Sequence, residues 1–284
     1  MPISVACAQI APEKGNLSAN LDKIAEYVLE AVRQEVDLLV FPETATSGYF
    51  VEGGVLECSL SEEDLCRELD LRIKRLGHPI DVVIGYYRSH EGNLYNSAAY
   101  CELGAESARI IHSYQKFFLP TYGMFDEERF VSRGRDLGIV NSRFGKLGLL
   151  ICEDTWHTIM PTLTAMAGAQ MIIVPAASPG RGFSGTTVGN LDRYMRLMMA
   201  MAEEHGVYAV NCQLCGFEGG KGFVGGSMML DPYGKLLSQG PLNEEHLLIA
   251  PVDLDIVEIA RAQVPLIADL RSAWGDIRRI VDDI

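Results

Sequence analysis

One stretch of sequence decides the fold of this chain: Gly148-Leu149-Leu150-Ile151-Cys152-Glu153-Asp154-Thr155-Trp156. Its apolar half predicts a strand buried on both faces, and a cysteine and two carboxylates follow directly. Two other apolar segments end in the same way, one at Glu43 and the other at Lys116. In an open α/β architecture, reactive side chains gather beyond the carboxyl ends of strands. We therefore expect Glu43, Lys116 and Cys152 to form one site.

Apolar and β-branched runs that predict strands recur along the whole chain, and stretches of helical periodicity separate them. The predicted strands cover 4–8, 37–41, 82–86, 108–113, 147–151, 171–174, 207–210, 226–230 and 247–252. The predicted helices cover 17–34, 61–76, 157–168, 187–205 and 255–262, and Asn16 or Ser18 is the expected cap of the first. This order holds more consecutive strands than a pure βαβ series. We therefore predict an α/β fold in which helices face a pair of sheets.

Length and composition indicate a single domain over residues 1–284, because 48% of the residues are hydrophobic and no linker-like or repeated segment marks a boundary. The 38 acidic and 24 basic residues give a net charge of -14, which repels nucleic acid and anionic membrane surfaces. The first residues lack a basic signal region, and no apolar run approaches the ~20 residues that span a bilayer. We expect a soluble, cytoplasmic protein with neither nucleic acid nor membrane as partner.

The chain has seven cysteines, an odd number, and with no secretion signal we expect reduced thiols. Cys212 and Cys215 form a C-x-x-C, which could be a redox pair or half of a zinc site. No second cysteine pair and no histidine pair lies at ligand spacing, so we favour a strand that ends at Cys212 and uses cysteine as a small apolar side chain. No metal and no cofactor is expected.

Two other motifs suggest chemistry that we consider less well supported. Residues 180–185 spell G-x-G-x-x-G after an apolar strand, but Pro175 and Pro179 separate the motif from that strand. We expect a flexible loop that lines the pocket and lets the backbone approach a ligand. His157 could pair with Cys152, but its place near a predicted helix start indicates capping or exposure.

Glu43, Lys116 and Cys152 complement one another chemically. A thiol, whose ordinary pKa is about 8.5, becomes a good nucleophile when a base such as Glu43 takes its proton. Attack on an amide carbonyl creates an oxyanion, which the Lys116 ammonium and the backbone N–H of Glu153 could stabilise. The same carboxyl could then protonate the leaving amine and activate the water that opens the thioester.

These residues resemble the nitrilase superfamily of carbon–nitrogen hydrolases, whose signature is a Glu, Lys and Cys triad on a four-layer α-β-β-α sandwich. The resemblance begins at residues 5–10 and continues through 39–43, 114–120 and 151–154 to 223–227 and 231–234, so it covers nearly the whole chain. It implies that fold, and hydrolysis of a small linear amide to acid and ammonia through a Cys152 thioester. Because family members commonly form homodimers or larger assemblies, it also implies a homo-oligomer.

The family often carries a second glutamate beside the catalytic lysine. By the resemblance, Glu127 is the best match and Glu128 the second choice. For either residue, a structural salt bridge to Arg129 or Arg133 is the alternative.

Several segments are similar to the glutaminase portion of glutamine-dependent NAD synthetases, notably 42–49, 119–127 and 152–156. This resemblance implies that a pocket for a polar amide such as a glutamine side chain is lined by Tyr49, Tyr122, Phe125, Glu153 and Ser178. Ordinary aromatic packing and loop capping are the alternative for each of them. Those synthetases continue into an ATP-binding domain, whereas this sequence stops at Ile284 without a phosphate-binding motif, so we expect no activation of a carboxylate by this chain.

Several other functions stay open. A nitrilase is one, since nitriles also accept thiolate attack. An N-carbamoyl amino acid hydrolase is another, and its substrate carboxylate would need an arginine such as Arg181 or Arg193. A module that only binds or regulates, or that supplies ammonia to a separate synthetase, is a further alternative.

Overall fold

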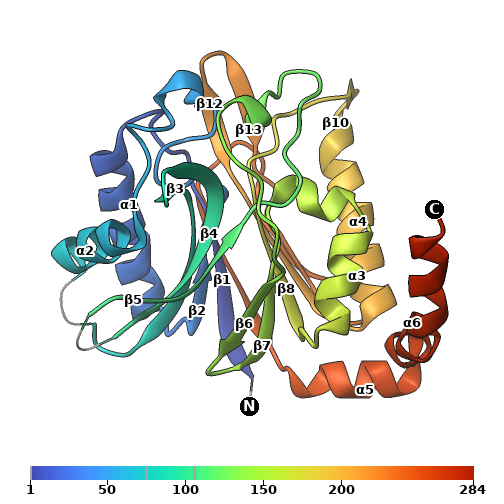
Figure 1. Ribbon diagram of the computed structural model, residues 1–284. Helices are drawn as coiled ribbons and strands as arrows, with labels where there is room; N and C mark the ends of the chain where they lie inside the picture. Colours follow the sequence, from blue (N-terminus) through green and yellow to red (C-terminus); the bar gives the residue numbers. More distant parts are fainter. Residues whose placement is uncertain (1, 74–75, 105–106) are drawn as a thin grey trace.

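The computed structural model describes residues 2–73, 76–104 and 107–284. Within these ranges, two six-stranded sheets face each other between two outer layers of helices (Figure 1). The strand order is β16-β1-β2-β3-β4-β5 in the first sheet and β15-β14-β11-β8-β7-β6 in the second. The predicted α/β class and the four-layer α-β-β-α sandwich are therefore confirmed.

The first sheet brings together strands from both ends of the chain. It contains β1 (Ile3–Gln9), β2 (Leu38–Val40), β3 (Ile80–His90), β4 (Asn93–Leu103), β5 (Arg109–Gln115) and β16 (His246–Val252). The helices α1 (Leu17–Arg33) and α2 (Glu62–Arg72) cover its outer face. The side chain of Asn16 accepts a hydrogen bond from the Ala19 N–H at 3.3 Å, so Asn16 rather than Ser18 caps α1.

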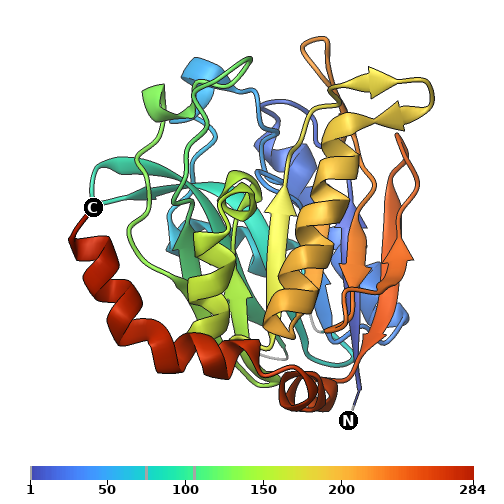
Figure 2. The ribbon, with the colours of Figure 1, turned by 90° about the vertical axis from the view of Figure 1, so that its right-hand side faces the viewer.

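The second sheet carries the stretch from which the fold was predicted. It contains β6 (Gly138–Ser142), β7 (Gly145–Leu149), β8 (Met171–Ala176), β11 (Tyr208–Gln213), β14 (Met228–Leu230) and β15 (Leu236–Gln239). The helices α3 (Ile159–Met166) and α4 (Gly189–His205) lie along its outer face (Figure 2). Strands β7, β8 and β11 run parallel, so their carboxyl ends share one edge.

The remaining elements lie at the edges of the sandwich. They are the 3₁₀ helices η1 (Glu52–Gly54), η2 (Glu127–Arg129) and η3 (Cys152–Trp156), the hairpins β9 (Phe183–Ser184) with β10 (Thr187–Val188) and β12 (Cys215–Glu218) with β13 (Lys221–Val224), and the helices α5 (Asp255–Gln263) and α6 (Leu266–Asp282). Figure 1 shows α5 below the ends of α3 and α4, and α6 outside the layer that they form. Among the described residues, no helix combines the length and apolarity needed to cross a bilayer.

Successive side chains of a strand point to opposite faces of the sheet, and this explains why apolar residues pack on both faces. On β1, Val5 and Cys7 point into the core between the sheets, whereas Ala6 and Ala8 pack toward α1. Both faces of β1 are therefore buried, which is why its sequence is continuously apolar rather than alternating.

Every predicted strand and helix overlaps an observed one, but several elements were not predicted. The missed elements are the strands β4, β6, β9, β10, β12, β13 and β15, the helix α6 and the 3₁₀ helices η1, η2 and η3. Strand β4 carries polar residues such as Asn93 and Asn96, which hide its strand pattern. The predicted helix 61–76 ends earlier, at Arg72, and residues 74–75 of that prediction lie outside the described ranges.

The chain approaches itself very closely where β2 ends. A Cβ on Gly85 of β3 would lie 2.2 Å from the Pro42 carbonyl oxygen and 2.7 Å from the Glu43 Cα. Because these contacts are with backbone, a side chain at Gly85 would force Glu43 out of place. The absence of a side chain at Gly85 therefore allows the backbone of Glu43 to lie where it does, at the end of β2.

We predict that Gly85→Ala lowers the free energy of unfolding by roughly 1–3 kcal/mol, the usual cost of overpacking a rigid site. Urea denaturation measures this difference. The matched control is Gly275→Ala in α6, where a Cβ would meet no atom within 4 Å and should stabilise the helix slightly. Equal stability of Gly85→Ala and the unmodified protein would contradict the packing argument.

Candidate active site

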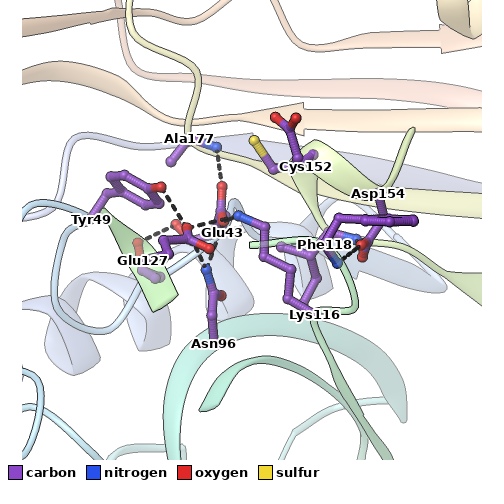
Figure 3. A network of polar contacts seen from close by, with 12 residues as sticks. Glu43, Tyr49, Asn96, Lys116, Phe118, Glu127, Cys152, Asp154 and Ala177 are labelled. Atoms are coloured by element: carbon purple, nitrogen blue, oxygen red, sulfur yellow. Dashed lines mark hydrogen bonds and ion pairs between the residues drawn. The ribbon is translucent and has the colours of Figure 1, made fainter. Parts of the chain in front are cut away.

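Lys116 lies at the centre of a buried network that joins three parts of the chain (Figure 3). Its Nζ donates to Glu43 Oε1 at 2.7 Å and to Glu127 Oε1 at 2.8 Å. Lys116 and Glu43 are fully buried, and Glu127 is 7% exposed. Burial alone would lower the pKa of Lys116, but the two carboxylates outweigh it and raise that pKa well above its usual value. The ammonium is therefore permanently charged.

Two further donors hold Glu43. The Asn96 side chain of β4 donates to its Oε1 at 2.8 Å, and the Ala177 N–H donates to its Oε2 at 2.8 Å. Asn96 also donates to Glu127 Oε1 at 3.3 Å, so one amide bridges both carboxylates. Sequence reasoning missed Asn96, although a polar residue buried in the middle of a strand is a sign of such a role.

Glu127 differs from its neighbour Glu128, which is exposed to solvent. Its Oε1 accepts a hydrogen bond from the Tyr49 hydroxyl at 2.5 Å, and its buried Oε2 has no hydrogen-bond partner among the described residues. Burial raises the pKa of Glu127 to about 7, although Lys116 opposes the shift. The geometry thus favours Glu127 over Glu128 as the second glutamate.

Cys152 begins η3 in a strained conformation, with a φ of 46°. The side chain of Asp154 fixes this turn. Its Oδ2 accepts from the Ile151 N–H at 3.0 Å and from the Tyr114 hydroxyl at 2.9 Å, and its Oδ1 accepts from the Phe118 N–H at 2.8 Å. Asp154 therefore ties the cysteine to the segment that carries Lys116.

The sulfur of Cys152 faces the buried network and is neutral at rest. Burial and the Glu43 charge raise the pKa of its thiol well above the usual value, against the opposing effects of Lys116 and of a hydrogen bond from Tyr194. The Tyr194 hydroxyl lies 3.2 Å from the sulfur. Figure 3 shows the sulfur turned toward the side of Lys116 and Glu43. A neutral thiol beside a carboxylate can react only after a base removes its proton.

A cavity of about 520 Å³, here called the mouth cavity, opens beside the cysteine turn. Tyr122 and Glu153 line it and contact each other, with the Tyr122 hydroxyl 2.9 Å from Glu153 Oε2. Two cations also line it, Arg181 and the exposed Arg193. The buried Nε of Arg181 has no hydrogen-bond partner among the described residues. The mouth cavity can therefore receive a small molecule that bears charge of both signs.

The other predicted pocket residues lie elsewhere. Tyr49 and Phe125 line a second cavity of about 270 Å³, which also contains Glu127. Both belong to an aromatic cluster with Phe50. Ser178 is buried, and its hydroxyl accepts a hydrogen bond from Asn190 at 2.8 Å. The structure thus brings together Tyr122 and Glu153 at the mouth. Phe125 lies between the two cavities, because its ring also contacts Tyr122, with 5.6 Å between centroids, and Arg181, at 5.0 Å. Tyr49 lies beside Glu127.

The other motifs noted in the sequence lie outside the buried network around Lys116. Cys212 lies buried in β11, as the predicted strand requires. Residues 180–185 enter the β9–β10 hairpin rather than a plain loop, and Gly182 lines the mouth cavity as expected. His157 is partly exposed and stacks on Phe118 with 3.7 Å between ring centroids. Among the described residues, no group of three or more His, Cys, Asp or Glu could hold a metal ion.

The sequence and the fold match a known class of enzymes. Residues 4–262 fit the model of the Carbon-nitrogen hydrolase family, so the chain belongs to that family. It is 31% identical over 255 residues to the glutamine-dependent NAD(+) synthetase of Thermotoga maritima, which covers 89% of this chain and 42% of that protein. It is 26% identical to the 2-oxoglutaramate amidase of Bacillus subtilis, covering 95% of this chain and 98% of that protein.

Solved structures agree with this assignment. The glutamine-dependent NAD+ synthetase of Acinetobacter baumannii superposes with a TM-score of 0.78 at 27% identity, covering 90% of this chain and 47% of that one. An amidase from Nesterenkonia sp. gives 0.70 at 25% identity, with 92% and 94% covered. The chain thus spans about half or less of these synthetase relatives. The resemblance to the nitrilase superfamily is confirmed, and the chain belongs to the carbon–nitrogen hydrolases.

The raised pKa of Glu127 predicts a loss of stability as the pH rises. The folded protein keeps this proton up to about pH 7, whereas the unfolded chain releases it near 4.5. Between these values, deprotonation therefore favours the unfolded state, by about 3 kcal/mol in total.

Urea denaturation at pH 5 and pH 8 measures this effect. Glu127→Gln should remove most of the 3 kcal/mol of pH dependence, while Glu128→Gln, at an exposed position, should keep it. Identical pH dependence in the unmodified protein and Glu127→Gln would show that Glu127 titrates normally.

Proposed function

We propose that the protein hydrolyses a primary amide to an acid and ammonia through a thioester on Cys152. The observation that carries this proposal is the buried Lys116 ammonium, bonded to both Glu43 and Glu127, beside a neutral thiol. This set holds a nucleophile, a base and a cation, which are the groups that acyl transfer from an amide requires. The amidase relatives support the same reaction class.

In the acylation step, the Cys152 sulfur attacks the carbonyl carbon while Glu43 takes the thiol proton. The carbonyl oxygen becomes an oxyanion, which the Lys116 ammonium and the Glu153 N–H stabilise. The C–N bond then breaks, and ammonia leaves with the proton that Glu43 returns. A thioester and an ionised Glu43 remain.

In the deacylation step, water attacks the thioester and gives a proton to Glu43. The C–S bond breaks, the acid leaves, and the proton returns to the sulfur. Glu43 is suited to this alternation because Asn96, Ala177 and Lys116 fix both of its oxygens. Glu127 contributes by holding Lys116 from its other side.

The charges of the mouth cavity support a particular substrate class. Arg181 and Arg193 can receive a carboxylate, and Glu153 can receive an ammonium group. Glutamine is such a molecule, because its side chain ends in a primary amide and its α-carbon carries both a carboxylate and an ammonium group. The names of the relatives agree, because one group uses glutamine and another protein acts on 2-oxoglutaramate, which keeps the carboxylate but lacks the ammonium.

A substrate panel tests the reaction and separates the rival functions. Glutamine, 2-oxoglutaramate, aliphatic amides, N-carbamoyl amino acids and nitriles are each scored for release of ammonia. We expect activity on the first two and a loss of at least about 1,000-fold in Cys152→Ala, because the nucleophile is gone. Cys58→Ala, at a buried cysteine remote from the network, is the matched control.

Undiminished turnover by Cys152→Ala would refute the thioester mechanism. Turnover only of nitriles or of N-carbamoyl amino acids would select those rivals instead. A protein that binds glutamine but releases ammonia only with an ATP-dependent partner would be a subunit of a synthetase, and no turnover at all would indicate a binding module.

The role of Glu153 gives a sharper prediction about the substrate. Glu153→Gln should raise the KM for glutamine about 10- to 100-fold, because a charge-assisted contact to the ammonium group is lost. The KM for 2-oxoglutaramate should change less than about threefold. Steady-state kinetics with Glu258→Gln, an exposed carboxylate on α5, provides the control. Equal effects on both substrates would contradict an ammonium contact.

A further inference from the structure

Helix α4 presents one buried stripe to the second sheet, and Tyr194 lies on it. The stripe contains Asn190, Tyr194, Met198, Met201, Ala202 and His205. These positions are three or four residues apart, so they share one face of the helix. Tyr194 is therefore held by the packing of the whole helix rather than by a loop.

The start of α4 is fixed by hydrogen bonds one turn before Tyr194. The Asn190 side chain donates to the Ser178 hydroxyl and to the Pro179 carbonyl, both at 2.8 Å, and it accepts from the Arg181 N–H at 2.7 Å. The aromatic ring is fixed as well, because Trp156 packs edge-on against it with 5.3 Å between centroids. Two independent sets of contacts thus determine where the hydroxyl points.

That hydroxyl points at the nucleophile. The Tyr194 oxygen lies 3.2 Å from the Cys152 sulfur, within hydrogen-bond reach for a sulfur acceptor, and the residue is 1% exposed. Neither the proposed mechanism nor the sequence motifs give this tyrosine a task. A buried hydroxyl aimed at a reacting atom can act on each step in which the charge of that atom changes.

We propose that Tyr194 is a catalytic residue: its hydroxyl donates a hydrogen bond to the Cys152 sulfur, and so stabilises the thiolate that attacks the amide and leaves the thioester. The inference deepens the proposed function, because it assumes that Cys152 is the nucleophile. No proton is transferred from the tyrosine. The thiol proton still goes to Glu43, and the C–S bond forms and breaks as described above.

The charges around the sulfur explain why such a donor is useful. Glu43 and Glu153 disfavour a thiolate, and Lys116 favours it but is already bonded to two carboxylates. Tyr194, in the helix layer that covers the second sheet, donates to the sulfur without adding charge. Burial and the nearby Cys152 raise the pKa of Tyr194 well above its usual value, so it stays a neutral donor.

The first experiment measures alkylation of Cys152 by iodoacetamide from pH 6 to pH 10, followed by mass spectrometry of the labelled peptide. Tyr194→Phe should slow alkylation wherever the thiol is mostly protonated, because loss of a hydrogen bond to a charged group raises the thiol pKa by about one unit. At pH 7 the rate should fall roughly threefold, because the remaining thiolate is more nucleophilic. An unchanged profile would overturn the proposal.

Tyr208→Phe is the matched control, since Tyr208 is equally buried and its hydroxyl contacts the backbone of Asp253 at the far end of the same sheet. Its profile should equal that of the unmodified protein. A second variant carries 3,5-difluorotyrosine at position 194, whose hydroxyl is a stronger donor, and its profile should move to lower pH. A shift in the same direction as that of Tyr194→Phe would also overturn the proposal, even if the latter variant folded poorly.

Turnover gives an independent readout. With the amide that the panel identifies, Tyr194→Phe should lower kcat about three- to tenfold and leave KM within twofold, because the contact acts on the sulfur and not on the bound substrate. Alkylation needs no substrate, so failure of the substrate proposal would leave that experiment valid. Conversely, full activity of Cys152→Ala would refute the proposed function without altering the alkylation profile of Tyr194→Phe.

Discussion

The ion pairs of the buried Lys116 are the constraint on which the rest of the site depends. An ammonium removed from water needs acceptors and compensating charge. The acceptors are Glu43 after β2 and Glu127 in η2, and Glu127 adds its full charge above about pH 7. If either carboxylate were absent, the lysine would lose a partner that holds its proton and its position. The Lys116 Nζ therefore links three elements: β5, which it follows, β2 through Glu43, and η2 through Glu127.

A second constraint links the two sheets through Asp154. Its carboxylate receives donors from its own turn and from the chain just after β5, so the strained Cys152 and the lysine cannot move independently. The strain at Cys152 is balanced by these bonds rather than by a glycine. Rigid strands, one shared carboxylate and a shared ion pair together create a site in which little has to move before reaction.

Sequence reasoning could find residues that end strands, because strand periodicity and strand direction are local properties. Glu43, Lys116 and Cys152 were found in this way, and the fold followed from the same strands. Asn96 and Tyr194 were missed because their importance depends on packing between distant elements, and neither a polar residue in β4 nor a tyrosine in α4 reveals its partner. The resemblance favoured Glu127 over Glu128 without a physical reason, and burial of Glu127 beside an exposed Glu128 supplies one.

Helix α4 has a consequence for how this enzyme responds to what it binds. The helix is fastened at Asn190 to the segment 178–181, part of which lines the mouth cavity, and about 6 Å further along its axis it reaches the nucleophile. The Arg181 N–H donates to Asn190, so a ligand that binds Arg181 contacts the segment that holds the start of α4 and hence Tyr194. The residues at the entrance and the hydroxyl beside the sulfur therefore share one helix as their support, so a substitution that displaces the start of α4 would disturb both.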